Sequence, residues 1–179
     1  RVGGWRCPRL EAADGRLGDL RSYLPVVEGV TLVSMARGPA FDLSREPLAA
    51  MVGALRSWHS LVVLDVGRCG GPAAREALRL AGRQLVVVSA SVRGVAAARQ
   101  VVAEYELERA ELVIRRGRGS LDSSLVAEAV GLPVLGEVPT DRRLADAAEA
   151  GEPPARGVRR GYRRAVDSLV QRLLAAVDD

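Results

Sequence analysis

The feature that most constrains the fold is a series of short, β-branched apolar blocks separated by segments with helical spacing. The blocks cover residues 30–33, 61–64, 85–88, 112–114 and 133–136. Continuous apolar blocks of this length predict strands that are buried on both faces, as in parallel sheets. The connections are long enough for a helix in each. The sequence therefore predicts an α/β fold with a mostly parallel sheet of about five strands and helices on both faces.

Capping residues delimit the helices between these blocks. Pro47 and Pro72 suit a first helical turn, and Ser91, Asp122 and Thr140 suit the N-cap position. The expected helices cover residues 47–58, 73–81, 92–105, 123–130 and 141–150, with Gly82 and Gly131 as C-terminal caps. Apolar residues at helical spacing from Tyr162 to Val177 predict a last amphipathic helix packed on the sheet.

Composition bounds the class of protein. The 179 residues are 48% hydrophobic and 27% charged, which fits one sizeable globular domain. We expect a loop-rich lead-in over residues 1–28 and an α/β domain over 29–179. No apolar run is long enough to span a bilayer, no signal-peptide pattern is present, and two cysteines suit a reducing compartment, so we expect a cytoplasmic protein.

The chain contains no lysine, so all 26 basic residues are arginine. A phosphate-loop lysine, a Schiff base and a lysine general base are therefore excluded within this sequence.

Asp65 follows the second apolar block and precedes Gly67 by two residues. A carboxylate at the carboxyl end of a buried strand faces the crevice where open α/β sheets bind ligands. In nucleotide hydrolases such a residue orients Mg²⁺, and a following glycine lets the backbone approach a phosphate. Strand-terminal aspartates before glycines also occur without any ligand, so both interpretations stay open.

Four short segments together resemble the MinD/ParA family of deviant P-loop ATPases. They are LVVLD at 61–65, SVR at 91–93, VPTD at 138–141 and GEP at 151–153. The resemblance implies a P-loop NTPase-like three-layer sandwich with ATP and Mg²⁺ as cofactors. Carried over by position, nucleotide contacts fall on Asp65, Gly67, Pro139 and Asp141, with Asp65 as the magnesium residue. The segments 15–20, 30–38 and 112–119 resemble the CpaE/TadZ-like branch, which includes septum-site-determining proteins.

The sequence departs from that family in its nucleotide-handling parts. No glycine-rich phosphate loop precedes residue 30, Gly67 stands where the family has proline, and an arginine run at 115–118 replaces a base-reading asparagine. The resemblance thus implies an incomplete sandwich that does not hydrolyse ATP alone. A missing central strand would leave two open strand edges. Direct closure, a strand from another chain and a strand upstream in the full protein are the alternatives.

Three functions stay open. The first is a degenerate ATPase-like localisation or assembly factor for septum-site control or for pilus or secretion machinery, acting through protein partners, with a homodimer among them. The second is the C-terminal part of an active MinD/ParA-like ATPase whose phosphate loop lies upstream. The third is a nonspecific nucleic-acid-binding module that uses the arginine clusters. Those arginines are Arg115, Arg116, Arg118, Arg159, Arg160, Arg163 and Arg164. The C-terminal helix could also lie on a membrane, although its apolar stripe suits packing on a sheet.

Overall fold

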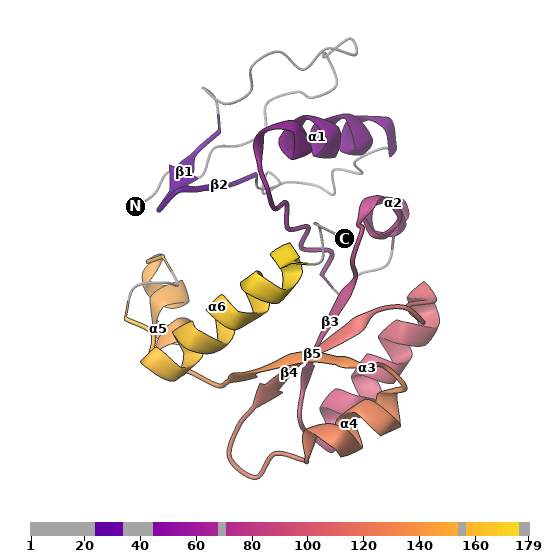
Figure 1. Ribbon diagram of the computed structural model, residues 1–179, viewed down its shortest axis with the longest axis vertical. Helices are drawn as coiled ribbons and strands as arrows, with labels where there is room; N and C mark the ends of the chain where they lie inside the picture. Colours follow the sequence, from indigo (N-terminus) through magenta and orange to yellow (C-terminus); the bar gives the residue numbers. More distant parts are fainter. Residues whose placement is uncertain (1–23, 34–44, 68–70, 154–156, 176–179) are drawn as a thin grey trace. The chain divides into compact units, whose positions relative to one another are not determined.

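The computed structural model describes residues 24–33, 45–67, 71–153 and 157–175 (Figure 1). The chain divides into two compact units, Arg1–Ala81 and Gly82–Asp179. The second unit contains a three-stranded parallel sheet, and the first contains a small hairpin and two helices.

The sheet of the second unit has the order β3-β4-β5. Its strands are β3 Leu85–Ser89, β4 Glu111–Arg116 and β5 Val134–Pro139. β3 and β4 pair in unbroken register, with Val87 opposite Val113, whereas the pairing of β4 with β5 shifts between Leu112 and Val113. All three strands are parallel, so their carboxyl ends lie at one edge.

Four helices accompany this sheet. They are α3 Val92–Tyr105, α4 Ser123–Val130, α5 Arg143–Ala150 and α6 Arg160–Ala175. α3 packs on β3 and contacts α4, while α6 packs on β5. The sheet and its helices are the magenta-to-yellow part of the ribbon (Figure 1).

Alternating side chains divide the core of the second unit between the two faces of the sheet. Val113, Leu135 and Val138 form a buried cluster with the apolar stripe of α6. The neighbours of Val113 along β4, Leu112 and Ile114, are fully buried and point to the opposite face. The α/β class, with helices on both faces of parallel strands, is therefore confirmed.

The first unit begins with the antiparallel hairpin of β1 Val26–Val27 and β2 Val30–Thr31. Glu28 and Gly29 form its turn, both at positive φ (52° and 84°), as in a two-residue hairpin loop. The helices α1 Arg45–Trp58 and α2 Pro72–Leu80 pack on each other around Leu48, Val52 and Ala77.

Glu76 is a buried acid of the first unit. Its side chain is 4% exposed and accepts two hydrogen bonds from Arg79, at 3.0 and 2.6 Å. These hydrogen bonds hold the pKa of Glu76 below its ordinary value, with a smaller contribution from the charges of Arg79 and Arg45.

Two predicted strands are wrong. The block at 30–33 is not a parallel strand, because Val30 and Thr31 pair with β1 across a local turn. The block at 61–64 is extended but forms no ladder with another strand among the described residues. Its alternation is nevertheless strand-like: Leu64 packs on α1 and α2, whereas Val63 is 78% exposed. An apolar block predicts which side chains seek burial, but a strand also needs a partner that supplies hydrogen bonds.

The predicted helices are confirmed with small shifts at their ends. Ser91 and Asp122 cap α3 and α4 as expected, and Gly131 ends α4 at φ 82°. Thr140 does not cap α5; the Asp141 side chain accepts from the amide of Arg143 instead. Ala81, not Gly82, is the C-cap of α2. β1 begins inside the expected lead-in, most of which lies outside the described residues, and the boundary at residue 28 stays a prediction.

In the part of the chain that the structure describes, none of the helices combines the length and apolar content needed to cross a bilayer.

Candidate functional site

The carboxyl edge of the parallel sheet is the candidate site, because ligands of open α/β sheets bind outside the carboxyl ends of the strands. Hydrogen bonds extend the ladder past the strand ends. The Ala90 amide donates to the Arg115 carbonyl at 3.1 Å, and the Thr140 amide donates to the Arg116 carbonyl at 2.7 Å. The three chain segments that leave the sheet therefore start from fixed positions.

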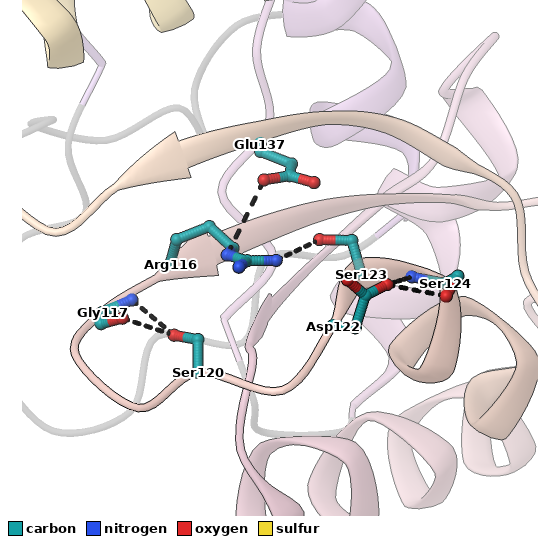
Figure 2. Close-up of polar contacts among 7 residues, drawn as sticks. All are labelled: Arg116, Gly117, Ser120, Asp122, Ser123, Ser124 and Glu137. Atoms are coloured by element: carbon teal, nitrogen blue, oxygen red, sulfur yellow. Dashed lines mark hydrogen bonds and ion pairs between the residues drawn. The ribbon is translucent and has the colours of Figure 1, made fainter.

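The loop between β4 and α4 closes on itself. The Gly117 amide donates to Ser120 Oγ at 2.6 Å, and Ser120 Oγ donates to the Gly117 carbonyl at 2.8 Å (Figure 2). Gly119 has φ +66°, a conformation that favours glycine. The Leu121 amide donates to the Ala90 carbonyl at 2.9 Å, which ties the loop to the end of β3.

Arg116 points across the edge rather than into solvent. Its guanidinium donates to Ser123 Oγ at 2.8 Å and lies 3.7 Å from the Glu137 carboxylate of β5 (Figure 2). Arg115 donates to Ser89 Oγ at 2.8 Å. Both arginines thus link neighbouring segments, whereas Arg118 is exposed and makes no ion pair within the described ranges.

Asp122 fixes the first turn of α4. Its Oδ1 accepts from the Ser124 amide at 2.9 Å and from Ser124 Oγ at 2.7 Å (Figure 2). The hydrogen bonds from the Ser124 side chain and amide lower the pKa of Asp122. The carboxylate at this helix start is the cap expected from the sequence.

Asp141 is the buried acid of the edge, with 6% of its surface exposed. Its Oδ2 accepts from the Arg159 amide at 2.6 Å, and its Oδ1 accepts from the Arg143 amide at 3.2 Å. The hydrogen bond from Arg159 contributes most to holding the pKa of Asp141 below its ordinary value, and the Arg143 amide adds to it. Both carboxylate oxygens are therefore used inside the protein.

Asp65 and Gly67 belong to the first unit, at the end of the extended segment 61–66. The Gly67 amide donates to Asp65 Oδ1 at 3.1 Å, and Gly67 has φ +68°. The second oxygen of Asp65 accepts no hydrogen bond among the described residues and has the hard-oxygen chemistry that magnesium prefers.

Of the four residues with predicted nucleotide contacts, Asp65 and Gly67 belong to the first unit and Pro139 and Asp141 to the second. The carboxylate of Asp141 accepts two backbone hydrogen bonds, one on each oxygen. In the described ranges, no three His, Cys, Asp or Glu side chains gather closely enough to hold a metal ion. Nucleotide contact by Asp65, Gly67, Pro139 and Asp141 stays a prediction.

Three arginine-bearing segments meet at this edge. Besides the run at 115–118, they are Arg142 and Arg143 at the start of α5 and the stretch that opens α6. The bond of the Arg159 amide to Asp141 and the bond of Arg143 Nη1 to the Gly157 carbonyl, at 2.8 Å, bring the last stretch to the end of β5. It contains Arg159, Arg160, Arg163 and Arg164.

Sequence reasoning missed Arg142, Arg143 and Glu137. The signal for the two arginines is their place directly after the VPTD segment, which ends the last predicted strand. Glu137 lies at an ordinary strand position, and only the pairing of β4 with β5 shows that it faces Arg116.

Comparison with known proteins shows what this architecture resembles. No protein-family model matches the chain. Two uncharacterized proteins of Mycobacterium tuberculosis, one from each of two strains, are 30% identical to it over 179 residues. The match covers 97% of this chain and 49% of each of those proteins. The chain thus spans about half the length of the curated relatives it matches.

Two solved structures have a similar fold. The MinD cell division protein of Aquifex aeolicus superposes with a TM-score of 0.57 at 16% identity, covering 74% of this chain and 61% of that protein. A ParA family ATPase from Chlorobium tepidum superposes with a TM-score of 0.64 at 15% identity, covering 87% and 64%. The chain therefore has a MinD/ParA-like P-loop NTPase fold.

Proposed function

We propose that this chain is a MinD/ParA-fold protein that works as a localisation or assembly factor through protein contacts rather than nucleotide turnover. In this proposal, the chain belongs to the CpaE/TadZ-like branch and acts in the cytoplasm. Its task is septum-site control or the placement of pilus or secretion machinery, and its partners are proteins of those assemblies.

The observation that supports this proposal is the use of Asp141. Its segment, VPTD, is the part of the sequence that most resembles the ATPase family, yet its carboxylate joins the starts of α5 and α6. Arg116 belongs to the arginine run that stands in place of the family's base-reading asparagine. Its guanidinium contacts Ser123 and Glu137 of the chain itself. The polar groups named here hydrogen-bond or pair with one another, which keeps this end of the sheet rigid. A rigid surface suits a protein that binds other proteins.

Titration calorimetry with ATP and Mg²⁺ tests this proposal. We expect no saturable heat at micromolar protein, with a MinD-type ATPase titrated in the same buffer as the positive control. A Kd in the micromolar range would contradict the proposal. It would favour the alternative in which this chain is part of an active ATPase, and a glycine-rich, lysine-containing loop in the upstream coding sequence would support that alternative independently.

The convergence of arginines favours a second candidate, nonspecific nucleic-acid binding. Guanidinium groups from three segments share one edge of the sheet, and phosphate contacts of this kind weaken steeply as salt rises. The test is retention of double-stranded DNA at low salt by the chain and by Arg118→Glu. Arg109→Glu, which makes the same charge change before β4 at the opposite edge, is the matched control. Absence of retention at low salt would end this candidate.

A further inference from the structure

α6 covers one face of the parallel sheet although no residue of α6 is itself buried. Its apolar stripe packs on Val113, Leu135 and Val138, and these three strand residues are buried beneath it. The other helices that accompany the sheet each contain a buried residue, whereas none of the 16 residues of α6 is buried. Elements with few buried residues open at a low cost in free energy. The polar contacts at the two ends of α6 therefore decide how firmly it is held.

The amino end of α6 carries charges of the wrong sign for a helix start. Arg159 precedes the helix, and Arg160, Arg163 and Arg164 follow within it. The first turn contains no acid, and the first acid along the helix is Asp167. Cations at a helix N-terminus oppose the macrodipole and also repel one another. Since Arg160 and Arg164 form no ion pair with an acid of the described segments, the charges of α6 disfavour its own first turn.

Asp141 supplies the anion that this helix start lacks. Its Oδ2 accepts from the Arg159 amide at 2.6 Å, and the residue is 6% exposed. In a capping box, an acid of the helix's own first turn accepts from the amide of the N-cap residue. Here the acid comes from the connection between β5 and α5, where its Oδ1 holds the Arg143 amide. A bond from Arg143 Nη1 to the Gly157 carbonyl supports the same segment, but Asp141 is the group with negative charge.

The carboxyl end of α6 is held in a favourable way. Arg83 Nη1 donates to the Arg172 carbonyl at 3.1 Å, and Arg172 Nη1 donates to the Leu135 carbonyl of β5. Arg83 also pairs with Glu111 of β4 at 2.5 Å. Guanidinium groups at a helix C-terminus satisfy its last carbonyls and agree with the macrodipole. α6 is thus anchored with its dipole at the carboxyl end and against its own charges at the amino end.

We propose that α6 is a releasable cover of the face of β4 and β5, which opens from its amino end and is latched by Asp141. Opening uncovers Val113, Leu135 and Val138, which the closed form shields from solvent. Removing the negative charge of Asp141 favours the open form, and reducing the positive charge at the start of α6 favours the closed form. All of these groups lie in the second unit, and the latch does not rest on the proposed function.

Amide hydrogen exchange of the full chain at neutral pH, followed by mass spectrometry, measures opening element by element. We expect the amides of α6 to exchange faster than those of α3, and residues 112–114 of β4 to exchange slowest. Asp141→Asn should speed exchange of α6 about tenfold or more relative to α3, because an amide side chain cannot replace a carboxylate that accepts on both oxygens. Asp146→Asn, at an exposed position of α5, is the control and should leave α6 unchanged.

Charge variants test the latch in chains that keep Asp141. Arg160→Glu places an acid in the first turn of α6 and should slow exchange of α6 about threefold or more relative to α3. Arg99→Glu makes the same charge change at an exposed position of α3 and should leave α6 unchanged. In the natural chain, added salt should also slow exchange of α6 relative to α3, because it screens the arginines from one another.

A thiol on the covered face reports whether α6 leaves the sheet. Val113→Cys, in a chain whose Cys7 and Cys69 are replaced by serine, carries its sulfhydryl beneath the apolar stripe of α6. We expect its reaction with a maleimide to be faster in the Asp141→Asn background and slower in the Arg160→Glu background. These rates should change in parallel with the exchange of the α6 amides.

Four results would overturn the proposal. Exchange of α6 as slow as that of residues 112–114 would show that α6 opens only with the whole unit. Equal acceleration of α3 and α6 by Asp141→Asn would make Asp141 a general stabilising residue. Unchanged or faster exchange of α6 in Arg160→Glu would show that the arginines do not oppose closure. A thiol at position 113 that stays unreactive while Asp141→Asn speeds exchange of α6 would show that the helix unwinds without leaving the sheet.

Discussion

Asp141 joins the starts of two helices, through the amide of Arg143 and the amide of Arg159, which lies 18 residues after Asp141 in the sequence. Both bonds are accepted by one carboxylate, which is strongest as an acceptor when it is ionised. Residues on either side of the connection between α5 and α6 therefore depend on the protonation state of a single side chain.

We predict that these two hydrogen bonds make the free energy of unfolding depend on pH in the acidic range. Because folding lowers the pKa of Asp141, the ionised group stabilises the fold at every pH above its unfolded value, near the ordinary 3.8. That contribution is lost as pH falls through the lower folded pKa. In Asp141→Asn the midpoint of urea unfolding should be lower at neutral pH and should change less between neutral and acidic pH. Asp146→Asn, at an exposed position of α5, is the control, and an unchanged acid dependence in Asp141→Asn would refute the prediction.

Gly94 is required by a close approach of α3 to β3. A Cβ at this position would lie 2.0 Å from the Ser89 carbonyl oxygen, a backbone atom that cannot rotate away. We predict that Gly94→Ala destabilises the protein by about 1–3 kcal/mol, as overpacking does. Gly53→Ala is the matched control, since a Cβ there meets nothing within 4 Å. It should be neutral or stabilising by up to about 1 kcal/mol. Urea unfolding of both variants measures the difference, and equal midpoints would contradict the assignment.

Between elements, α6 approaches β5 closely at Gly136. A Cβ on Gly136 would lie 2.6 Å from Leu169 Cδ2, the flexible end of a side chain in the α6 cluster. We predict that Gly136→Ala costs about 0.5–1.5 kcal/mol of stability because Leu169 must change rotamer. In the background of Leu169→Ala the same substitution should cost less than about 0.5 kcal/mol, because the clashing atoms are gone. A double-mutant cycle on unfolding free energies measures this coupling; additive costs would show that Gly136 is not needed for the packing of α6.

Local signals explain why the helices are predictable from the sequence. Asp122 and Gly131 delimit α4 at both ends, because an N-cap hydrogen bond and a positive φ involve only near neighbours. The start of α5 is not predictable in this way. Arg142 occupies the N-cap position without a side-chain cap. The Asp141 carboxylate accepts from the amide of Arg143 and also from the amide of Arg159, which comes to it only in the folded chain.

Whether an apolar block forms a strand depends on another strand that pairs with it, and the contacts of the candidate site depend on the same pairing. The blocks at 85–88, 112–114 and 133–136 form the sheet because they pair with one another. The block at 61–64 has the same composition but pairs with no strand in the described ranges. Likewise, the sequence can nominate Arg115, Arg116 and Arg118 as exposed cations, yet it does not show that Arg116 faces Glu137, since that contact depends on the register of β4 and β5.

A ligand that binds only the folded chain raises the free energy of unfolding. The thermal stability of the whole chain therefore detects nucleotide binding, wherever on the protein the nucleotide binds. A ligand present at about 100 times its Kd adds about 2.7 kcal/mol to the stability of the folded state. For a chain of this size each kcal/mol raises Tm by about 2–4 °C. Mg²⁺–ATP at such an excess over a micromolar Kd would therefore raise Tm by roughly 5–11 °C.

We predict that Tm stays within about 1 °C of its value without nucleotide, because Asp141 is committed to backbone amides and the chain has no lysine to hold a phosphate. Calorimetric or fluorescence thermal scans measure it. Tripolyphosphate with Mg²⁺ is the control, since arginines at the carboxyl edge attract any polyanion, and such attraction weakens with added salt. A rise of several degrees with ATP but not with tripolyphosphate, persisting at high salt, requires recognition of the nucleoside. That result would mean that the chain binds a nucleotide, even though the carboxylate of Asp141 accepts hydrogen bonds from the chain's own backbone.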